Sequence, residues 1–152
     1  MVELVLSLGI LAFAFVGLLA LLPAGMATFH KAIDASVASQ ISQKIVDEAQ
    51  ESEFNVYTSK PQAVRYFDDE GNELTTSKGA IYQVNVRIQA ASQVPGSTDP
   101  NQNLAEITVQ IANNPGNKTM TSDVNNLWVA NPTISMTTYS TFLAGMYNAS
   151  LE

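Results

Sequence analysis

Close to the start of the sequence, residues 4–22 contain no Asp, Glu, Lys or Arg, and Ser7 is their only hydroxyl residue. As an α-helix rising ~1.5 Å per residue, this run reaches about 29 Å, which matches the hydrocarbon core of a bilayer. A helix that is apolar on all sides must be covered by lipid or by protein. The remainder of the sequence is polar and rich in Asn, Gln, Ser and Thr, so we interpret the chain as bipartite.

Two ordinary explanations of the apolar run are a cleavable secretory signal and a permanent membrane anchor. A signal requires a basic flank, a shorter apolar stretch and a small-residue cleavage site. Here the flank is Met1-Val2-Glu3, and the first basic residue is Lys31, which disfavours a signal. A membrane anchor remains an alternative. In that case Glu3 lies in the headgroup region, where its carboxylate stabilises the N-terminus of the helix.

Beyond Pro23 the apolar residues follow a helical period, which predicts an amphipathic stripe. The stripe consists of Met26, Phe29, Ile33, Val37, Ile41 and Ile45. We therefore predict one helix from residue 1 to about 53, hydrophobic in its first half and amphipathic in its second. Gly17, Pro23 and Gly25 lower the helix propensity at the junction, so we expect the backbone to be bent or locally unwound around residues 17–25.

Residues 59–61, Ser-Lys-Pro, break the helical pattern, and alternating apolar and polar residues typical of half-buried strands follow. The expected strands are 63–67, 81–88, 104–111 and 133–142, with a turn at 68–72. The predicted fold is α+β, with a long N-terminal α-helix packed through residues 26–53 on a small antiparallel sheet of three or four strands. The domains are the helix, 1–53, and a β-rich head, 54–152.

Two long connectors, 91–103 and 113–126, are dense in Pro, Gly, Asn, Asp and Ser. Loops of this length are often functional or disordered. We expect Trp128, the only tryptophan, to anchor a loop against the core of the head. The alternative is an exposed platform on which a glycan stacks.

The start of the sequence resembles that of mature type IV pilins and pseudopilins. That family begins with an aromatic residue, a hydroxyl residue, two aliphatic residues and a glutamate, and Met1, Val2, Glu3 and Leu4 match the aliphatic pair, the glutamate and its aliphatic successor. The resemblance implies the pilin fold and a mature chain in which two residues precede Met1. Residues 21–35 and 66–72 are similar to pilin-like cassette proteins (the B family) of Verrucomicrobia.

The resemblance also implies a structural subunit that polymerises through its N-terminal helix into a type IV pilus-like filament. Its assembly residues are Glu3, Gly17, Pro23 and Gly25, and Glu3 neutralises the terminal amine of a neighbouring subunit. Its partners are copies of itself, the inner membrane before assembly and the pilus assembly machinery, and its filament is extracellular or periplasmic. The alternatives are a minor pseudopilin of a secretion or DNA-uptake machine, and a plain membrane-anchored periplasmic or surface-binding domain.

Composition disfavours several other functions. Seven basic residues against fourteen acidic ones, with a formal net charge of −7, disfavour nucleic acid as a partner. The absence of Cys removes disulfides and thiolate sites, and His30, the only histidine, cannot build a zinc site or a familiar triad alone. We expect no cofactor and no enzymatic activity.

Oxygen-rich segments are the remaining candidates for a site. Asp68, Asp69 and Glu70 predict a solvated turn, with a calcium site as the alternative. A second group consists of Asp99, Asn101 and Asn103. Asn117 and Asn148 begin Asn-x-Ser/Thr tripeptides, which are glycosylation acceptors only where the transferase is present.

Overall fold

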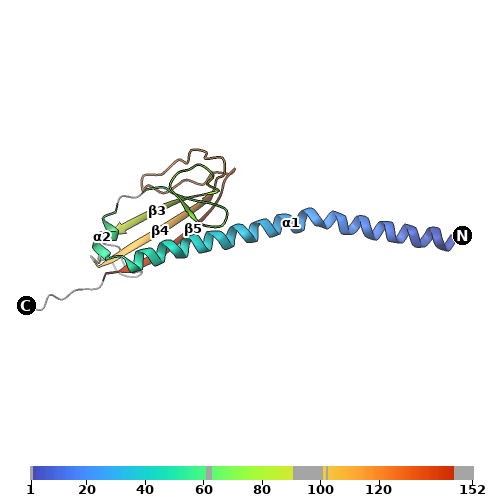
Figure 1. Cartoon of the computed structure of the whole chain (residues 1–152), viewed down its shortest axis with the longest axis horizontal. Helices are drawn as coiled ribbons and strands as arrows, with labels where there is room; N and C mark the ends of the chain where they lie inside the picture. The colour runs from blue at the N-terminus through green and yellow to red at the C-terminus, as the bar shows by residue number, and fades with distance from the viewer. Residues whose placement is uncertain (1, 61–62, 91–100, 102, 146–152) are drawn as a thin grey trace, which may run out of the picture. The chain divides into compact units, whose positions relative to one another are not determined.

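The computed structural model describes residues 2–60, 63–90, 101 and 103–145 (Figure 1). The first helix, α1 (Val2–Glu51), continues without interruption through Gly17, Pro23 and Gly25. Of the two alternatives expected around residues 17–25, a bend or local unwinding, the unwinding is therefore wrong for the single chain. Pro23 removes only its own hydrogen bond to the carbonyl of residue 19, and a helical glycine costs about 1 kcal/mol relative to alanine. The surrounding Leu and Ala residues favour the helix enough to continue it.

The chain divides into two compact units, Met1–Ser36 and Val37–Glu152. The predicted stripe divides at the same place. Val37, Ile41 and Ile45 are buried, whereas the members that precede residue 36 are exposed. The prediction that the sheet packs on residues 26–53 is thus corrected to residues 37–49, the part of α1 whose buried side chains belong to the same core cluster as the strands.

After α1 come a short helix, α2 (Phe54–Thr58), and five strands. The strands are β1 (Arg65–Phe67), β2 (Glu73–Leu74), β3 (Tyr82–Ala90), β4 (Leu104–Asn113) and β5 (Ser135–Ala144). They form one antiparallel sheet in the order β2-β1-β3-β4-β5. The four predicted strands and the turn at 68–72 are confirmed, with shifted ends. Strand β2 escapes prediction because two residues are too few to show an alternation.

One face of the sheet meets α1 and forms the main core. Val84 and Val86 of β3 pair in register with Ile111 and Val109 of β4, so that their side chains emerge on the same face. In Figure 1 the later turns of α1 run along β3, β4 and β5, and the buried stripe of α1 belongs to the same cluster as these strand residues. A long helix packed on a small antiparallel sheet, the predicted α+β layout, is therefore confirmed.

The other face of the sheet is covered by the segment between β4 and β5. Trp128 is 7% exposed and packs with Ala112 and Ile134 in a second, smaller cluster. Ala112 follows Ile111 and so points away from α1. Burial of Trp128 as a loop anchor is confirmed, but its place against the main core is wrong. Strand β4 has buried residues on both of its faces: α1 covers one face, and the loop covers the other.

Candidate functional site

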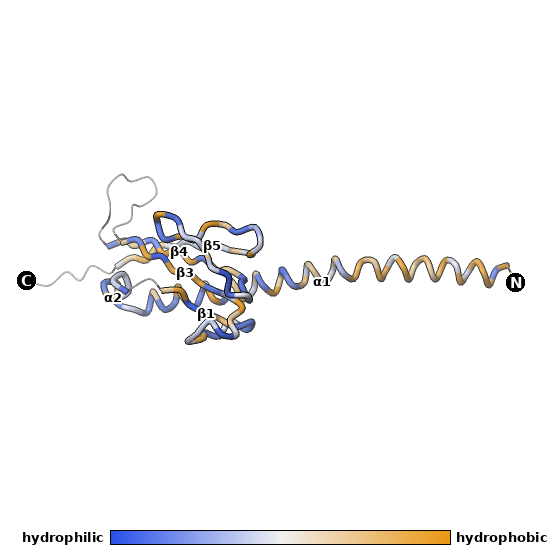
Figure 2. Tube along the Cα trace, turned by 90° about the horizontal axis from the view of Figure 1, so that it is seen from above, coloured by the Kyte–Doolittle hydropathy of each residue, from blue (hydrophilic) through white to orange (hydrophobic). Residues whose placement is uncertain are grey.

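The N-terminal part of α1 presents apolar side chains to its surroundings on every side. All side chains of residues 2–33, which we call the apolar segment, are exposed. Figure 2 shows apolar residues along this part of α1 and mixed residues farther along it. The segment is long and apolar enough to cross a membrane, and none of its most apolar stretch is buried within the chain. Burying one large aliphatic side chain gains about 1.5–3 kcal/mol, so burial of this segment in lipid or against protein is strongly favourable.

The four predicted assembly residues all lie on α1 but do not form one site. At ~1.5 Å per residue, Glu3 and Pro23 are about 30 Å apart along the axis. Glu3 lies in the first turn, where its charge is favoured by the helix dipole. Around Gly17 and Gly25, a Cβ atom would meet nothing within 4 Å. These glycines leave shallow places on the surface at which another helix can approach closely.

Two hydroxyl groups add hydrogen bonds to the backbone of this helix. Ser7 donates to the carbonyl oxygen of Glu3 at 2.8 Å, and Thr28 donates to that of Ala24 at 3.0 Å. Both are bonds to the residue four positions earlier, a pattern that slightly weakens and often bends helices. Thr28 is about one turn beyond Pro23, so two residues that favour helix bending lie close to Ala24.

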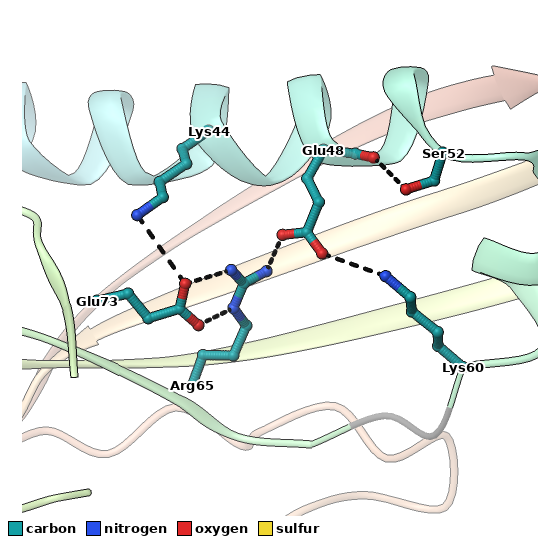
Figure 3. A network of polar contacts seen from close by, with 6 residues as sticks. All are labelled: Lys44, Glu48, Ser52, Lys60, Arg65 and Glu73. Carbon is teal, nitrogen blue, oxygen red and sulfur yellow. Dashed lines mark hydrogen bonds and ion pairs between the residues drawn. The ribbon is translucent and has the colours of Figure 1, made fainter. Parts of the chain in front are cut away.

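Within the head, five charged side chains join α1 to β1 and β2. We call this group, drawn in Figure 3, the ion-pair clasp; its members are Lys44, Glu48, Lys60, Arg65 and Glu73. Arg65 is at its centre. Its Nε and Nη2 donate to the two carboxylate oxygens of Glu73, each at 2.6 Å, and its Nη1 donates to Oε2 of Glu48 at 2.7 Å. The guanidinium thus holds one strand carboxylate in bidentate geometry and one helix carboxylate at the same time.

The two lysines complete the clasp at longer range. Lys60 Nζ is 3.4 Å from Oε1 of Glu48, and Lys44 Nζ is 3.9 Å from Oε2 of Glu73. Lys44 also lies over the ring of Phe67, with its Nζ 5.5 Å from the centroid. Lys60 thus adds positive charge near the last turn of α1, which has no basic residue of its own and where the helix dipole favours positive charge.

The central arginine of the clasp is partly buried, which strengthens its interactions with the two carboxylates. The Arg65 side chain is 20% exposed. The hydrogen bond to Glu73 is the main reason why the pKa of Arg65 is raised, although burial opposes it. The hydrogen bonds from Arg65 in turn hold the pKa of the Glu73 carboxyl below its usual range. Burial, together with the nearby Glu48, raises the pKa of Tyr57. The clasp links helix and sheet through the short hydrogen bonds from Arg65 to Glu48 and Glu73.

Sequence reasoning missed the clasp. One signal was present: Arg65 stands two residues before Phe67 and so shares its inward face. A charged residue at an inward position of a strand needs a partner. Because β1 pairs with β2 with Phe67 opposite Glu73, that partner is found only once the register is known.

The predicted calcium segment is a tight acidic turn. Oδ1 of Asp68 accepts hydrogen bonds from the backbone N–H groups of Glu70 and Asn72, at 3.0 and 2.7 Å, and Oδ2 accepts from the Asn72 side chain at 3.0 Å. The bonds from Asn72 lower the pKa of Asp68. Gly71 has φ +82° and faces Ile41 and Val37 of α1. The oxygens of Asp68 thus close a turn against α1.

The other candidates are also placed. Among residues 2–60, 63–90, 101 and 103–145, no three His, Asp or Glu side chains are arranged to hold a metal ion. Asn101 accepts a hydrogen bond from the backbone of Asn103, while Asp99 lies outside the described residues, as does Asn148. Asn117 is tied on both sides: its side chain donates to the Ser77 carbonyl and accepts from Gln83. A glycan on its amide nitrogen would compete with the first of these bonds.

Comparisons of the chain with models of known protein families, with curated proteins and with solved structures give no match. What the chain does is therefore inferred from two features, an apolar segment that needs cover and a head fixed to the same helix by a core and a clasp.

Proposed function

We propose that the chain is the structural subunit of a type IV pilus-like helical filament, held in the inner membrane by its apolar segment before assembly and polymerised through that segment afterwards. One observation carries the proposal. The side chains of residues 2–33 are exposed on every side, and the same helix then continues into a folded head. Lipid covers such a segment in a membrane, and a bundle of copies covers it outside one.

The proposal gives each part of the chain a role. The apolar segments form the filament core, and the heads face outward, which suits a polar surface and an acidic net charge. Glu3 has a specific task, because an unpaired carboxylate inside an apolar core costs several kcal/mol. Pairing with the terminal amine of a neighbouring subunit offsets much of that cost. A subunit of this kind needs no catalytic centre and no cofactor, and the proposal assigns neither.

The test is assembly of the full chain after detergent removal. The chain is purified in detergent, the detergent is dialysed away, and the product is examined by electron microscopy and sedimentation. We expect helical filaments. A matched variant, Leu11→Glu, places a charge in the apolar segment and should give none. If the wild-type chain inserts into added liposomes but forms no filaments under any condition, it is a membrane-anchored domain and the filament proposal is wrong.

Glu3 is tested in the same assay. Glu3→Ala should lower the yield of filaments while Trp128 fluorescence shows a head that is still folded. Ser7→Ala, which removes only a hydroxyl bond to the helix backbone, is the matched control and should assemble like wild type. Wild-type yield from Glu3→Ala would remove Glu3 from the assembly mechanism.

A further inference from the structure

Strand β5 forms one edge of the sheet along its full length. It pairs with β4 in an unbroken register from Asn113 opposite Ser135 to Leu104 opposite Ala144. No strand within the part of the chain that the structure describes pairs with its other side. In an antiparallel strand, alternate residues direct their N–H and C=O groups away from the partner. The free side of β5 therefore offers a row of backbone donors and acceptors.

The two edges of the sheet differ in how they are protected. The edge at β2 is two residues long, contains Glu73 and follows an acidic turn. Short strands and charged residues are common means of preventing edge-to-edge pairing. The ten residues of β5 have none of these features: they include no charge and no proline, and their unbroken register has no bulge. Among the strands that the structure describes, β5 is thus the long edge strand that lacks these protections over its whole length.

The charge distribution around β5 favours a second copy of this chain as the partner. Two copies, each with a formal net charge of −7, repel over most of their surfaces. Residues 124–145 contain no Asp, Glu, Lys or Arg, so two β5 edges meet without bringing like charges together. Strand β5 is also rich in Thr and Ser, and cross-strand Thr–Thr and Thr–Ser pairs stabilise a sheet.

We propose that β5 pairs antiparallel with β5 of a second copy, joining two heads into one continuous sheet. The pairing is isologous, because the same edge serves in both copies. It extends the sheet by main-chain hydrogen bonds, as in strand addition to an open edge. The inference goes beyond the filament proposal and does not depend on it, because it stands on the head alone.

An isologous pair makes a geometric prediction. One position of β5 lies at the two-fold axis and faces itself, with Cβ atoms about 4.5–5.5 Å apart. Each step along the strand separates the two copies of a residue by about 7 Å more, since each strand advances about 3.4 Å in opposite directions. The chain contains no cysteine, so single cysteines can be introduced one at a time without background reaction.

The experiment is a cysteine scan of the full chain in detergent micelles, where filaments do not form. Residues 137–142 are replaced singly by Cys, oxidised mildly, and analysed for covalent dimers. We expect the dimer yield to peak at one position, or at two neighbouring positions, and to fall on both sides. Thr75→Cys, next to the protected edge, is the control and should give little dimer. Uniform yields, or yields no higher than that of Thr75→Cys, would overturn the proposal.

A charge placed on the edge gives an independent readout. Thr138→Lys combined with Ser140→Lys puts four cations across the paired strands of a dimer, and should raise the dimer dissociation constant at least tenfold in analytical ultracentrifugation. Both residues are exposed, and unchanged Trp128 fluorescence would show that the head is still folded. Thr75→Lys is the matched control. An unchanged dissociation constant in the double variant contradicts the pairing, whereas absence of filaments contradicts only the proposed function.

Discussion

At the residue scale, Arg65 satisfies two carboxylates from different elements. Arg65→Met keeps the aliphatic stem but leaves Glu48 and Glu73 without their shared donor. We expect the free energy of unfolding of the head to fall by about 1–3 kcal/mol, as for polar groups that lose their partner in a partly buried place. The free energy of unfolding of Arg65→Lys should lie between those of wild type and Arg65→Met, because an ammonium keeps the charge but cannot form the bidentate pair. Urea unfolding followed by Trp128 fluorescence, on the full chain in detergent, measures both.

The control for Arg65 is Lys78→Met, which removes an exposed cation elsewhere in the head. This variant should unfold within about 0.5 kcal/mol of wild type, as is usual for surface substitutions. Equal stability of Arg65→Met and Lys78→Met would mean that the clasp contributes nothing to the fold.

Glu73 makes the stability of the head depend on pH. Its pKa is lowered in the folded state by the hydrogen bonds from Arg65, so the folded carboxyl binds its proton less readily than the unfolded one. Its contribution is present above the unfolded pKa, about 4.3, and is lost as pH falls through the lower folded pKa. We expect the difference in urea midpoint between wild type and Glu73→Gln to be largest near pH 6 and to shrink toward pH 3.

Asp68 and Asp123 provide the background for that measurement. The pKa of each is lowered, by hydrogen bonds from Asn72 and from the backbone of Leu127 respectively, and both groups titrate equally in wild type and Glu73→Gln. Both proteins should therefore lose stability in acid, and only the difference between them reports on the clasp. A difference that stays constant from pH 6 to pH 3 would contradict the assignment.

At the scale of the elements, side-chain alternation was sufficient to find β3 and β4, because Val84, Val86, Val109 and Ile111 all face one core. The apolar segment was equally predictable, since composition and length are enough to recognise it. The clasp and the loop cover were not predictable. Both depend on register: Arg65 meets Glu73 only when β1 and β2 pair, and Gln110 meets the loop only when that loop folds over β4.

The loop between β4 and β5 is held by buried amides. Gln110 accepts a hydrogen bond from the backbone N–H of Trp128 at 2.6 Å and donates to its carbonyl at 3.1 Å. Asn85 donates to the Asn126 carbonyl at 2.7 Å, and Asn114 donates to that of Lys118 at 2.8 Å. A loop dense in turn residues is therefore fixed by side chains of the sheet that it covers.

Gln110→Leu tests this attachment. It leaves the N–H and C=O of Trp128 without partners, at about 1–3 kcal/mol for each buried group, and the loop should loosen while the main core stays intact. Because Trp128 is the only tryptophan, its emission should shift to the red and its quenching by acrylamide should increase. Gln89→Leu, at an exposed position of β3, is the control. A Gln110→Leu spectrum identical to wild type would show that the loop holds without the amide.

At the scale of the whole molecule, α1 is continuous in the single chain, and in the proposed filament subunit this would be the state before assembly. We predict that part of residues 15–25 becomes non-helical in the filament, because Pro23 leaves one carbonyl without a donor and Gly17 and Gly25 weaken the turns around it. A stretched segment would lengthen the rod and let subunits slide into register. Amide hydrogen exchange should be faster there in filaments than in detergent, and Pro23→Ala should reduce the change. Straight, protected helix from Leu4 to Ile45 in the filament would refute this.

The continuity of α1 also bears on how the head folds. A helix is costly to nucleate but cheap to extend, and isolated helices shorter than about 12–15 residues are marginal in water. The part of α1 that packs on the sheet, residues 37–49, is about that length. It does not have to nucleate alone, because the apolar segment that precedes it is driven to be helical wherever lipid or other copies cover it. Where the apolar segment is covered in this way, we expect the turns that contain Ile41 and Ile45 to be added by propagation, and the strands to condense on a helix that is already formed.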